Sequence, residues 1–197
     1  MYLIVGLGNP GREYAGTRHN VGFDTIDFLA YKNDVKLNKL KFNAVFGEYN
    51  INSEKVLLFK PVTYMNLSGN AVIEAVRFYK IPVENIIVIY DDIDIGLGSL
   101  RIRPHGSSGT HNGMKSLIYQ LQTENFKRIR IGIGKSKNPN ISLADYVLQK
   151  FDNDERTAVN EAIQNAGIAA EDIVRFGLEH AMSNYNKSIK EWNLLTI

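Results

Sequence analysis

Two short, wholly apolar runs limit what this chain can fold into. Residues 2–5 read YLIV and residues 86–90 read IIVIY, and neither run contains a charged side chain. Runs of this kind, bounded by turn residues, are typical of strands that are buried on both faces of a sheet. Such sheets are parallel and carry helices on both faces, so the two runs favour an α/β protein.

Strand and helix patterns alternate along the rest of the chain. Further strands are expected over residues 44–50, 55–60, 99–103 and 127–134, the first two as a hairpin that turns at Asn52-Ser53. Helices are expected over residues 21–31, from Ser68 as N-cap to before Pro82, after residue 113, over 142–151 behind a capping box of Ser142 and Asp145, and over 154–183 and 184–197. The polar, lysine-rich segment 32–43 is expected to be a solvated connection. This pattern predicts one domain, residues 1–197: an α/β sandwich with a mixed, mostly parallel central sheet flanked by helices.

The composition excludes several kinds of chemistry. The chain has no cysteine, which rules out thiol catalysis, disulfide bonds and cysteine-ligated zinc. Its net charge is +2 and its pI about 8.7, so a nucleic-acid partner requires basic side chains that cluster locally. No apolar stretch approaches the roughly 18 residues of a spanning helix, and the opening stretch lacks the features of a signal peptide. We therefore expect a cytoplasmic protein that does not enter a membrane.

Polar segments follow three of the expected strands. They are the glycine-rich turn at residues 6–11, the segment at 63–68 and the acidic segment at 91–94. In α/β sheets, ligands bind outside the carboxyl ends of the strands. If these strands are parallel neighbours, four polar side chains converge on one pocket: Asn9, His19, Asn66 and Asp91.

The chemistry that these side chains allow is hydrolysis. His19 can take up a proton near neutral pH, and Asp91 could hold its imidazole in one tautomer and stabilise the imidazolium. The chain has no cysteine and no G-x-S-x-G, so the nucleophile is expected to be water. Asn9 and Asn66 could hold that water or donate to a developing oxyanion. The pocket is thus suited to hydrolysing an activated acyl bond without metal or cofactor.

The turn at residues 6–11 also allows a different hypothesis, because it matches the dinucleotide-binding fingerprint G-x-G-x-x-G. That fingerprint needs a helix opened by its third glycine and an acidic residue about 20 positions later, at a strand end. Residues 10–14 are a poor helix start, and Asp24 and Asp27 lie inside an expected helix. A nucleotide-dependent enzyme therefore stays open as the less favoured hypothesis.

Two more alternatives remain at this stage. Three carboxylates after the second apolar run could bind magnesium or only shape a turn: Asp91, Asp92 and Asp94. The other histidines lack H-E-x-x-H spacing, which argues against zinc. A non-catalytic RNA-binding module is the last alternative, and it predicts RNA binding without catalysis.

Six motifs carry a resemblance that runs nearly end to end. They are VGLGNPG (5–11), TRHNVG (17–22), KPVTYMNLSG (60–69), YDD (90–92), HNGMK (111–115) and RIRIGIG (128–134). In this order they resemble the motifs of the bacterial peptidyl-tRNA hydrolase family. The resemblance implies an enzyme that cleaves the ester bond between a peptide and the 3′-terminal ribose of tRNA, without metal or cofactor. It also implies a monomeric cytoplasmic enzyme without an obligate protein partner.

The resemblance further implies roles for the residues in matching positions. His19 would be the base and Asp91 its orienting partner. Five residues are implied to bind substrate or tRNA: Asn9, Tyr14, Met65, Asn66 and Asn112. Arg103 and Arg130 resemble the clamp on the 5′-phosphate of tRNA, and Lys135 and Lys137 are further candidates for it. The chain departs from the family at residues 106–110, where Thr110 replaces a common glycine, and this leaves the loop and any contact of His111 undetermined.

Overall fold

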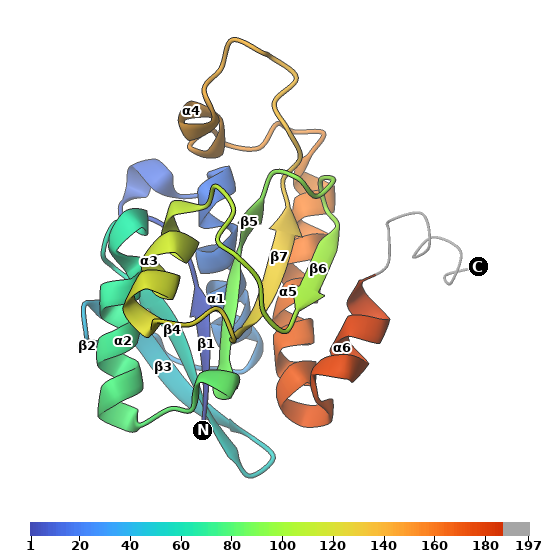
Figure 1. The fold of residues 1–197 in the computed structure, drawn as a ribbon. Coiled ribbons are helices and arrows are strands. Elements are labelled where there is room, and N and C mark those ends of the chain that lie inside the picture. The colour runs from blue at the N-terminus through green and yellow to red at the C-terminus, as the bar shows by residue number, and fades with distance from the viewer. Residues whose placement is uncertain (187–197) are drawn as a thin grey trace.

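The computed structural model describes residues 1–186. In this part of the chain, seven strands form one sheet in the order β2-β3-β4-β1-β5-β7-β6 (Figure 1). The strands are β1 (Tyr2–Gly6), β2 (Lys39–Lys41), β3 (Ala44–Ile51), β4 (Glu54–Pro61), β5 (Ile86–Asp92), β6 (Leu100–Arg103) and β7 (Lys127–Gly132). The helices are α1 (Val21–Lys32), α2 (Ser68–Tyr79), α3 (Asn112–Leu121), α4 (Leu143–Val147), α5 (Arg156–Phe176) and α6 (Leu178–Tyr185). Single 3₁₀ turns are η1 (Arg12–Tyr14), η2 (Arg18–Asn20), η3 (Met65–Leu67) and η4 (Val83–Asn85).

The centre of the sheet is parallel and its borders are antiparallel. β1 pairs in parallel with β4 and β5, and β5 pairs in parallel with β7. The pairs β2–β3, β3–β4 and β6–β7 are antiparallel. The predicted mixed sheet with a mostly parallel centre is confirmed. Because β1, β4, β5 and β7 run the same way, their carboxyl ends share one edge of the sheet, above which α4 lies (Figure 1).

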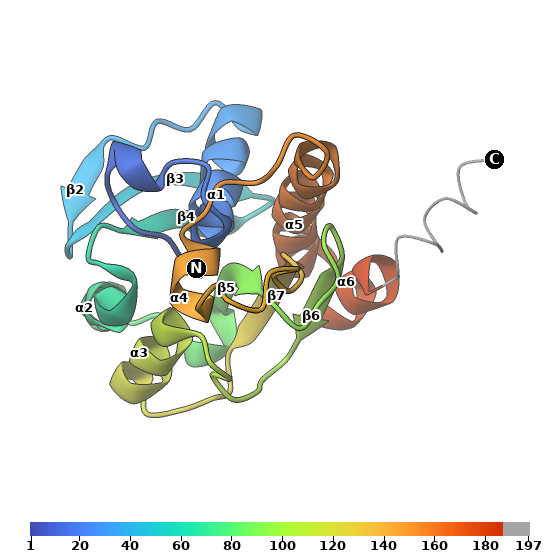
Figure 2. The same ribbon diagram turned by 90° about the horizontal axis from the view of Figure 1, so that it is seen from above.

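Helices cover both faces of the sheet, so the central strands are buried on both sides. In β1, Ile4 packs in the core formed with α1 and α5, whereas Leu3 and Val5 pack in the core formed with α2 and α3. Figure 2 shows these two helix pairs on opposite sides of the sheet. No helix of the described residues is both long and apolar enough to cross a lipid bilayer.

Glycines bring α1 unusually close to the sheet. A Cβ on Gly22 would lie 2.4 Å from the carbonyl oxygen of Ile89, and a Cβ on Gly6 would lie 2.1 Å from the carbonyl oxygen of Gly22. Both positions therefore exclude a side chain. This close packing places η2, which directly precedes α1, at the carboxyl ends of β1 and β5.

The dinucleotide hypothesis loses its support at this turn. The first α-helix begins at Val21 and not behind Gly11, which is followed only by the single turn η1. The glycines serve the packing of α1 on the sheet, and the amide of Phe23 in the first turn of α1 already donates to the carbonyl oxygen of Leu7 at 3.2 Å, so it is not free to bind a phosphate.

Several predicted boundaries are wrong. The helix expected over residues 154–183 ends at Phe176, because Gly177 has a φ of 91°, and α6 then folds back toward β6. Ser68 is not an N-cap: it is the first residue of α2, and its hydroxyl donates to the carbonyl oxygen of Met65.

Other boundaries differ in smaller ways. The segment 32–43 contains the short exposed strand β2, which pairs with β3. The polar sequence of this segment did not indicate that pairing. The helix expected over 142–151 is limited to α4, although Ser142 caps it as predicted by accepting from the amide of Asp145. Of the final helix expected over residues 184–197, residues 187–197 lie outside the described part of the chain.

Candidate active site

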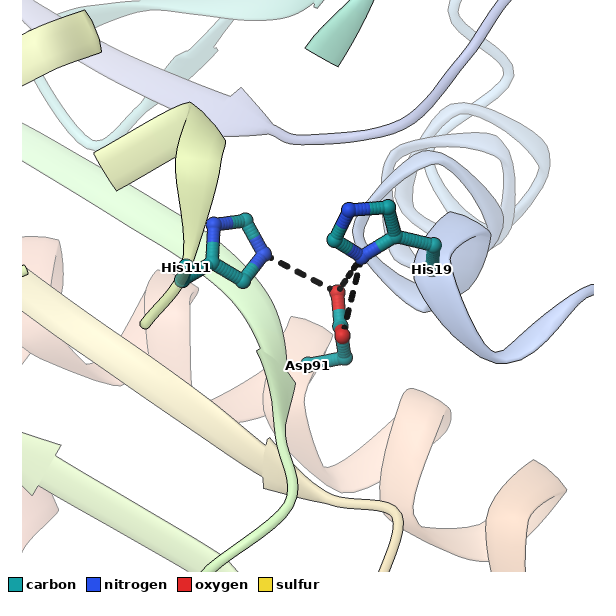
Figure 3. Close-up of side chains that lie close together, drawn as sticks. All are labelled: His19, Asp91 and His111. Atoms are coloured by element: carbon teal, nitrogen blue, oxygen red, sulfur yellow. Dashed lines mark hydrogen bonds and ion pairs between the residues drawn. The ribbon is translucent and has the colours of Figure 1, made fainter. Parts of the chain in front are cut away.

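His19 and Asp91 meet where the first glycine turn and β5 come together. His19 belongs to η2, and Asp91 is the penultimate residue of β5. Nδ1 of His19 lies 2.8 Å and 3.0 Å from the two carboxylate oxygens of Asp91 (Figure 3). The Asp91 side chain is 3% exposed and that of His19 is 11% exposed. The predicted convergence of these two residues is therefore present.

His111 is a third member of this cluster. It is the N-cap of α3, and its Nδ1 accepts a hydrogen bond from the amide of Met114 at 3.3 Å. A nitrogen that accepts carries no proton, so the ring proton is on Nε2, which donates to Asp91 at 3.1 Å. Its ring lies 4.8 Å from that of His19. Sequence reasoning left His111 unassigned, because histidine is not a preferred N-cap residue and so gave no local signal.

The surroundings of Asp91 keep its carboxylate ionised. Burial alone would raise the pKa of Asp91, but the imidazoles of His19 and His111 outweigh burial and lower that pKa well below its ordinary value. An ionised Asp91 only accepts hydrogen bonds, so Nδ1 of His19 is its donor. In the neutral imidazole of His19 the other ring nitrogen, Nε2, carries no proton and can act as a base, and Figure 3 shows it turned away from Asp91.

Asn9 is held rigidly beside this cluster. Its main-chain amide donates to Oδ1 of Asn20 at 2.9 Å, and Nδ2 of Asn20 donates back to its carbonyl at 3.0 Å. Its side-chain Oδ1 accepts from the amide of Met65 at 2.8 Å. Since only oxygen can accept there, the orientation of the carboxamide is determined and its NH₂ group is the half left to donate elsewhere.

A cleft of about 520 Å³ opens beside His19 and Asp91. One wall is the loop over residues 105–110 together with His111 and Asn112, and another wall is α4. Arg103 and Arg130 also line this cleft, so the structure brings them to the same site as the His19–Asp91 pair.

The other predicted substrate residues do not line this cleft. Met65 is buried, and Asn66 is exposed beside it on η3. Tyr14 packs edge to face with Tyr64, their ring centroids 6.5 Å apart, and Tyr64 is 57% exposed. Tyr64 was not singled out from the sequence. Asn9 does not line the cleft either, and of these residues Met65 is tied to it by the bond from its amide to Oδ1 of Asn9.

The arginines near the cleft lie on one face of the sheet, because side chains alternate between the two faces along a strand. Arg103 lies opposite Arg128 in the antiparallel pair β6–β7, and Arg130 lies two residues further along β7, on the same face as Arg128. Arg128 is buried and donates to the carbonyl oxygens of Ser107 and Glu124, which ties the 105–110 loop to the sheet. Arg103 is exposed to solvent.

The three carboxylates at the end of β5 have separate partners. Asp91 accepts from the two histidines, Asp92 accepts from Nε of Arg130 at 2.6 Å, and Asp94 pairs with Lys135 at 2.9 Å. A shared magnesium site needs these oxygens to converge, so the pairing does not favour one. Lys135 is largely exposed, and its partner in this arrangement is Asp94.

One cluster of the described residues could hold a metal by geometry. The ligand atoms of His19, Asp91 and His111 all lie within 4.8 Å of one another. However, both imidazoles direct an N–H at the carboxylate, and a metal would have to replace both protons. The arrangement fits a hydrogen-bonded triad better than a metal centre.

Comparison with known proteins shows the family to which the chain belongs. A family model described as peptidyl-tRNA hydrolase matches residues 3–192. The chain belongs to the peptidyl-tRNA hydrolase family. The peptidyl-tRNA hydrolase of Alkaliphilus metalliredigens (strain QYMF) is 56% identical over 186 residues, which are 94% of this chain and 100% of that protein. That of Thermoanaerobacter sp. (strain X514) is also 56% identical, with the same coverage.

Solved structures show the same fold. The crystal structure of peptidyl-tRNA hydrolase from Acinetobacter baumannii matches with a TM-score of 0.88 at 37% identity, and the match covers 94% of each chain. The resemblance drawn from the motifs is thereby confirmed at the level of family and fold.

Proposed function

We propose that this chain hydrolyses the ester bond between a peptide, or an N-blocked aminoacyl group, and the 3′-terminal ribose of tRNA, and so returns the tRNA to translation. The observation that carries this proposal is the His19–Asp91 pair beside a cleft, in a member of the peptidyl-tRNA hydrolase family. The enzyme would act in the cytoplasm as a monomer, without metal, cofactor or obligate protein partner.

In the first step, His19 activates water. Nε2 of His19 takes a proton from a water molecule as its oxygen attacks the ester carbonyl carbon. The imidazolium that forms keeps its Nδ1–H on the carboxylate of Asp91, which stabilises the new charge. In the second step the carbon–oxygen bond to the ribose breaks, and His19 returns the proton to the departing 3′ oxygen. The products are a peptide acid and tRNA with a free 3′ hydroxyl.

Carboxamides supply the donors that this reaction needs. The NH₂ group of Asn9 can donate to the oxyanion or hold the water, because its oxygen is already occupied by Met65. Asn112 lines the cleft and can donate to the acceptor end or to the peptide main chain. Asn66 is solvent-exposed on η3, where it can contact incoming substrate and water.

The tRNA would be recognised by charge and stacking and not by base sequence. Arg103 and Arg130 offer guanidinium groups that suit a terminal 5′-phosphate. A few such cations bind an acceptor stem through its backbone. Tyr14 and its neighbour Tyr64 offer aromatic surface on which a base of the 3′ end can stack.

The test is release of the acyl group from N-blocked aminoacyl-tRNA with EDTA present. We expect turnover to survive chelation in the wild type. We expect His19→Ala to lose several orders of magnitude in kcat while its Kd for tRNA stays within about threefold. Near-normal turnover in that variant would remove His19 as the base, and tRNA binding without cleavage in the wild type would favour a non-catalytic RNA-binding module. Loss of turnover in EDTA, restored by added metal, would contradict metal independence.

A further inference from the structure

Arg18, the residue directly before His19, is a buried charge that the proposed reaction does not use. Its side chain is 5% exposed. While His19 reaches Asp91, Arg18 reaches α4 and the segment that follows it. Its guanidinium carbon lies over the rings of both Tyr146 and Phe151, 4.7 Å from each ring centroid.

Hydrogen bonds also join Arg18 to this segment. Its Nη2 donates to Oε2 of Glu155 at 2.7 Å, and its Nη1 donates to the carbonyl oxygen of Lys150 at 3.3 Å. Its main-chain amide donates to the carbonyl oxygen of Gln149 at 2.9 Å. The preceding residue, Thr17, forms an isolated β-bridge with Lys150. Two consecutive residues of the turn that carries His19 therefore bind residues more than 130 positions away.

The burial of this arginine is costly for the fold. Taking a guanidinium out of water carries a large desolvation penalty, and apolar residues of similar volume often stabilise a protein as well or better. Within the described residues, its Nε is buried without a hydrogen-bond partner. If this position served stability alone, an apolar side chain would avoid the buried charge and the unpaired Nε. A guanidinium is needed only if the side chain must hold the two rings at a set spacing.

The helix α4, which Arg18 contacts through Tyr146, forms one wall of the cleft. Leu143, Ala144 and Val147 of α4 line the cleft, and Tyr146 of the same helix stacks on Arg18. Isolated helices of five residues are not stable in water, so the position of α4 depends on its tertiary contacts. Figure 2 shows α4 lying over the sheet as seen from above.

We propose that Arg18 is a positioning residue that couples the α4 wall to the turn carrying His19, so that wall and base keep a set spacing across the cleft. This proposal rests on the proposed function, which supplies the identity of the substrate. Arg18 touches neither the substrate nor the reacting atoms. Its loss therefore loosens the hold on substrate more than it slows the bond-breaking step.

The deciding variants change the stack without creating an unpaired buried charge. Tyr146→Leu removes one of the two rings and leaves Arg18 and Glu155 in place, and Phe151→Leu removes the other ring. Tyr146→Phe is the matched control for the ring, because it keeps the ring over Arg18 and loses only the hydroxyl, with its bond to the carbonyl oxygen of Ile133 and its contact with Arg18. Arg18→Lys keeps the charge but lacks the planar guanidinium that lies over the two rings.

Two measurements separate positioning from a merely structural role. Hydrogen exchange of the amides in residues 143–151 reports how firmly the wall is held. KM, kcat and the pH profile of kcat on N-blocked aminoacyl-tRNA report its consequence. For Tyr146→Leu and Arg18→Lys we expect exchange about tenfold faster and KM raised about 5- to 20-fold. We expect kcat to stay within about threefold and the acidic limb of the pH profile to stay in place, with Tyr146→Phe matching the wild type.

The proposal is overturned if Tyr146→Leu exchanges at the wild-type rate, or if faster exchange leaves KM unchanged. It is also overturned if kcat falls and the acidic limb moves, because Arg18 would then act on His19 itself. If the wild type does not cleave the ester, the proposed function fails. The exchange rates and the Kd for tRNA would still test the coupling, so the two failures are distinguishable.

Discussion

The carboxamide of Asn20 holds the main chain of Asn9 at both of its polar groups, accepting from the amide and donating to the carbonyl. Asn20 belongs to the same 3₁₀ turn as His19, so this pair of bonds links the base to the glycine-rich turn. With its Oδ1 occupied by the amide of Met65, Asn9 is presented to the site as a hydrogen-bond donor.

Asn9→Asp tests this orientation. Aspartate keeps an oxygen for the amide of Met65 but replaces the NH₂ donor by a second acceptor. We expect kcat to fall about 10²- to 10³-fold, the range for loss of one oxyanion donor, with an unchanged circular dichroism spectrum. If Asn9→Asp keeps kcat within about threefold of the wild type, Asn9 does not act through its amino group.

Asp91→Asn tests the orienting carboxylate. Nδ1 of His19 faces both oxygens of Asp91, so the amide nitrogen of asparagine would oppose an N–H that needs an acceptor. We expect kcat to fall by up to about 10⁴ through stabilisation of the wrong tautomer. Because the pKa of Asp91 lies well below its ordinary value, its ionisation adds no limb to the wild-type pH profile above about pH 4. Wild-type kcat in this variant would contradict the assigned role.

His111→Asn separates the two contacts of His111. Asparagine is a good N-cap and can still accept from the amide of Met114, but it is too short to replace the bond to Asp91. We expect kcat to fall about 10- to 100-fold, the range for a hydrogen bond to a charged group, with a nearly unchanged Tm. His111→Ala is the comparison, because it loses both contacts and should also lower Tm. Equal kcat in His111→Asn and the wild type would limit His111 to capping α3.

Arg103→Ala and Arg130→Ala test the phosphate clamp through salt dependence. Each arginine that neutralises one phosphate contributes about 0.9 to the slope of log K against log salt. We expect weaker tRNA binding and a slope reduced by about 1 in each variant, while Arg77→Ala, on the exposed side of α2, serves as the control. An unchanged slope in the cleft variants would remove them from the clamp.

Asp24 links stability to pH. Its burial, and secondarily the charge of Asp27, raises its pKa to about 6, although Lys60 opposes the shift. The folded state thus holds a proton that the unfolded chain has already lost, so the free energy of unfolding should fall as pH rises from about 4 to 6. Asp24→Asn should raise that free energy by about 1–2 kcal/mol at pH 7.5, since the helix N-terminus offsets part of the cost, and by little at pH 4. Urea unfolding of the wild type and of Asp24→Asn at both pH values gives these free energies. An equal increase at pH 4 and pH 7.5 would contradict the link between the pKa of Asp24 and stability.

Local sequence was sufficient for much of the fold and for the chemical pair at the site. The apolar runs of β1 and β5 indicated strands buried on both faces, and polar residues at their carboxyl ends indicated the site. The His19–Asp91 pair followed because parallel neighbours end at the same edge of a sheet. These inferences depend on burial patterns and strand direction, which a linear sequence carries.

Contacts between distant segments were decided only by the tertiary structure. His111 reaches Asp91 because the loop over residues 104–110 crosses the sheet before α3 begins, and no residue pattern specifies that path. Arg18 meets Glu155 across 137 positions, and its burial among aromatic rings could not be told from an exposed arginine beside a histidine. The glycine-rich turn matched two functions in sequence, and the start of α1 at Val21 separated them. The physical reason is that periodicity reports which face of an element is buried, whereas the partner it is buried against depends on how the whole chain packs.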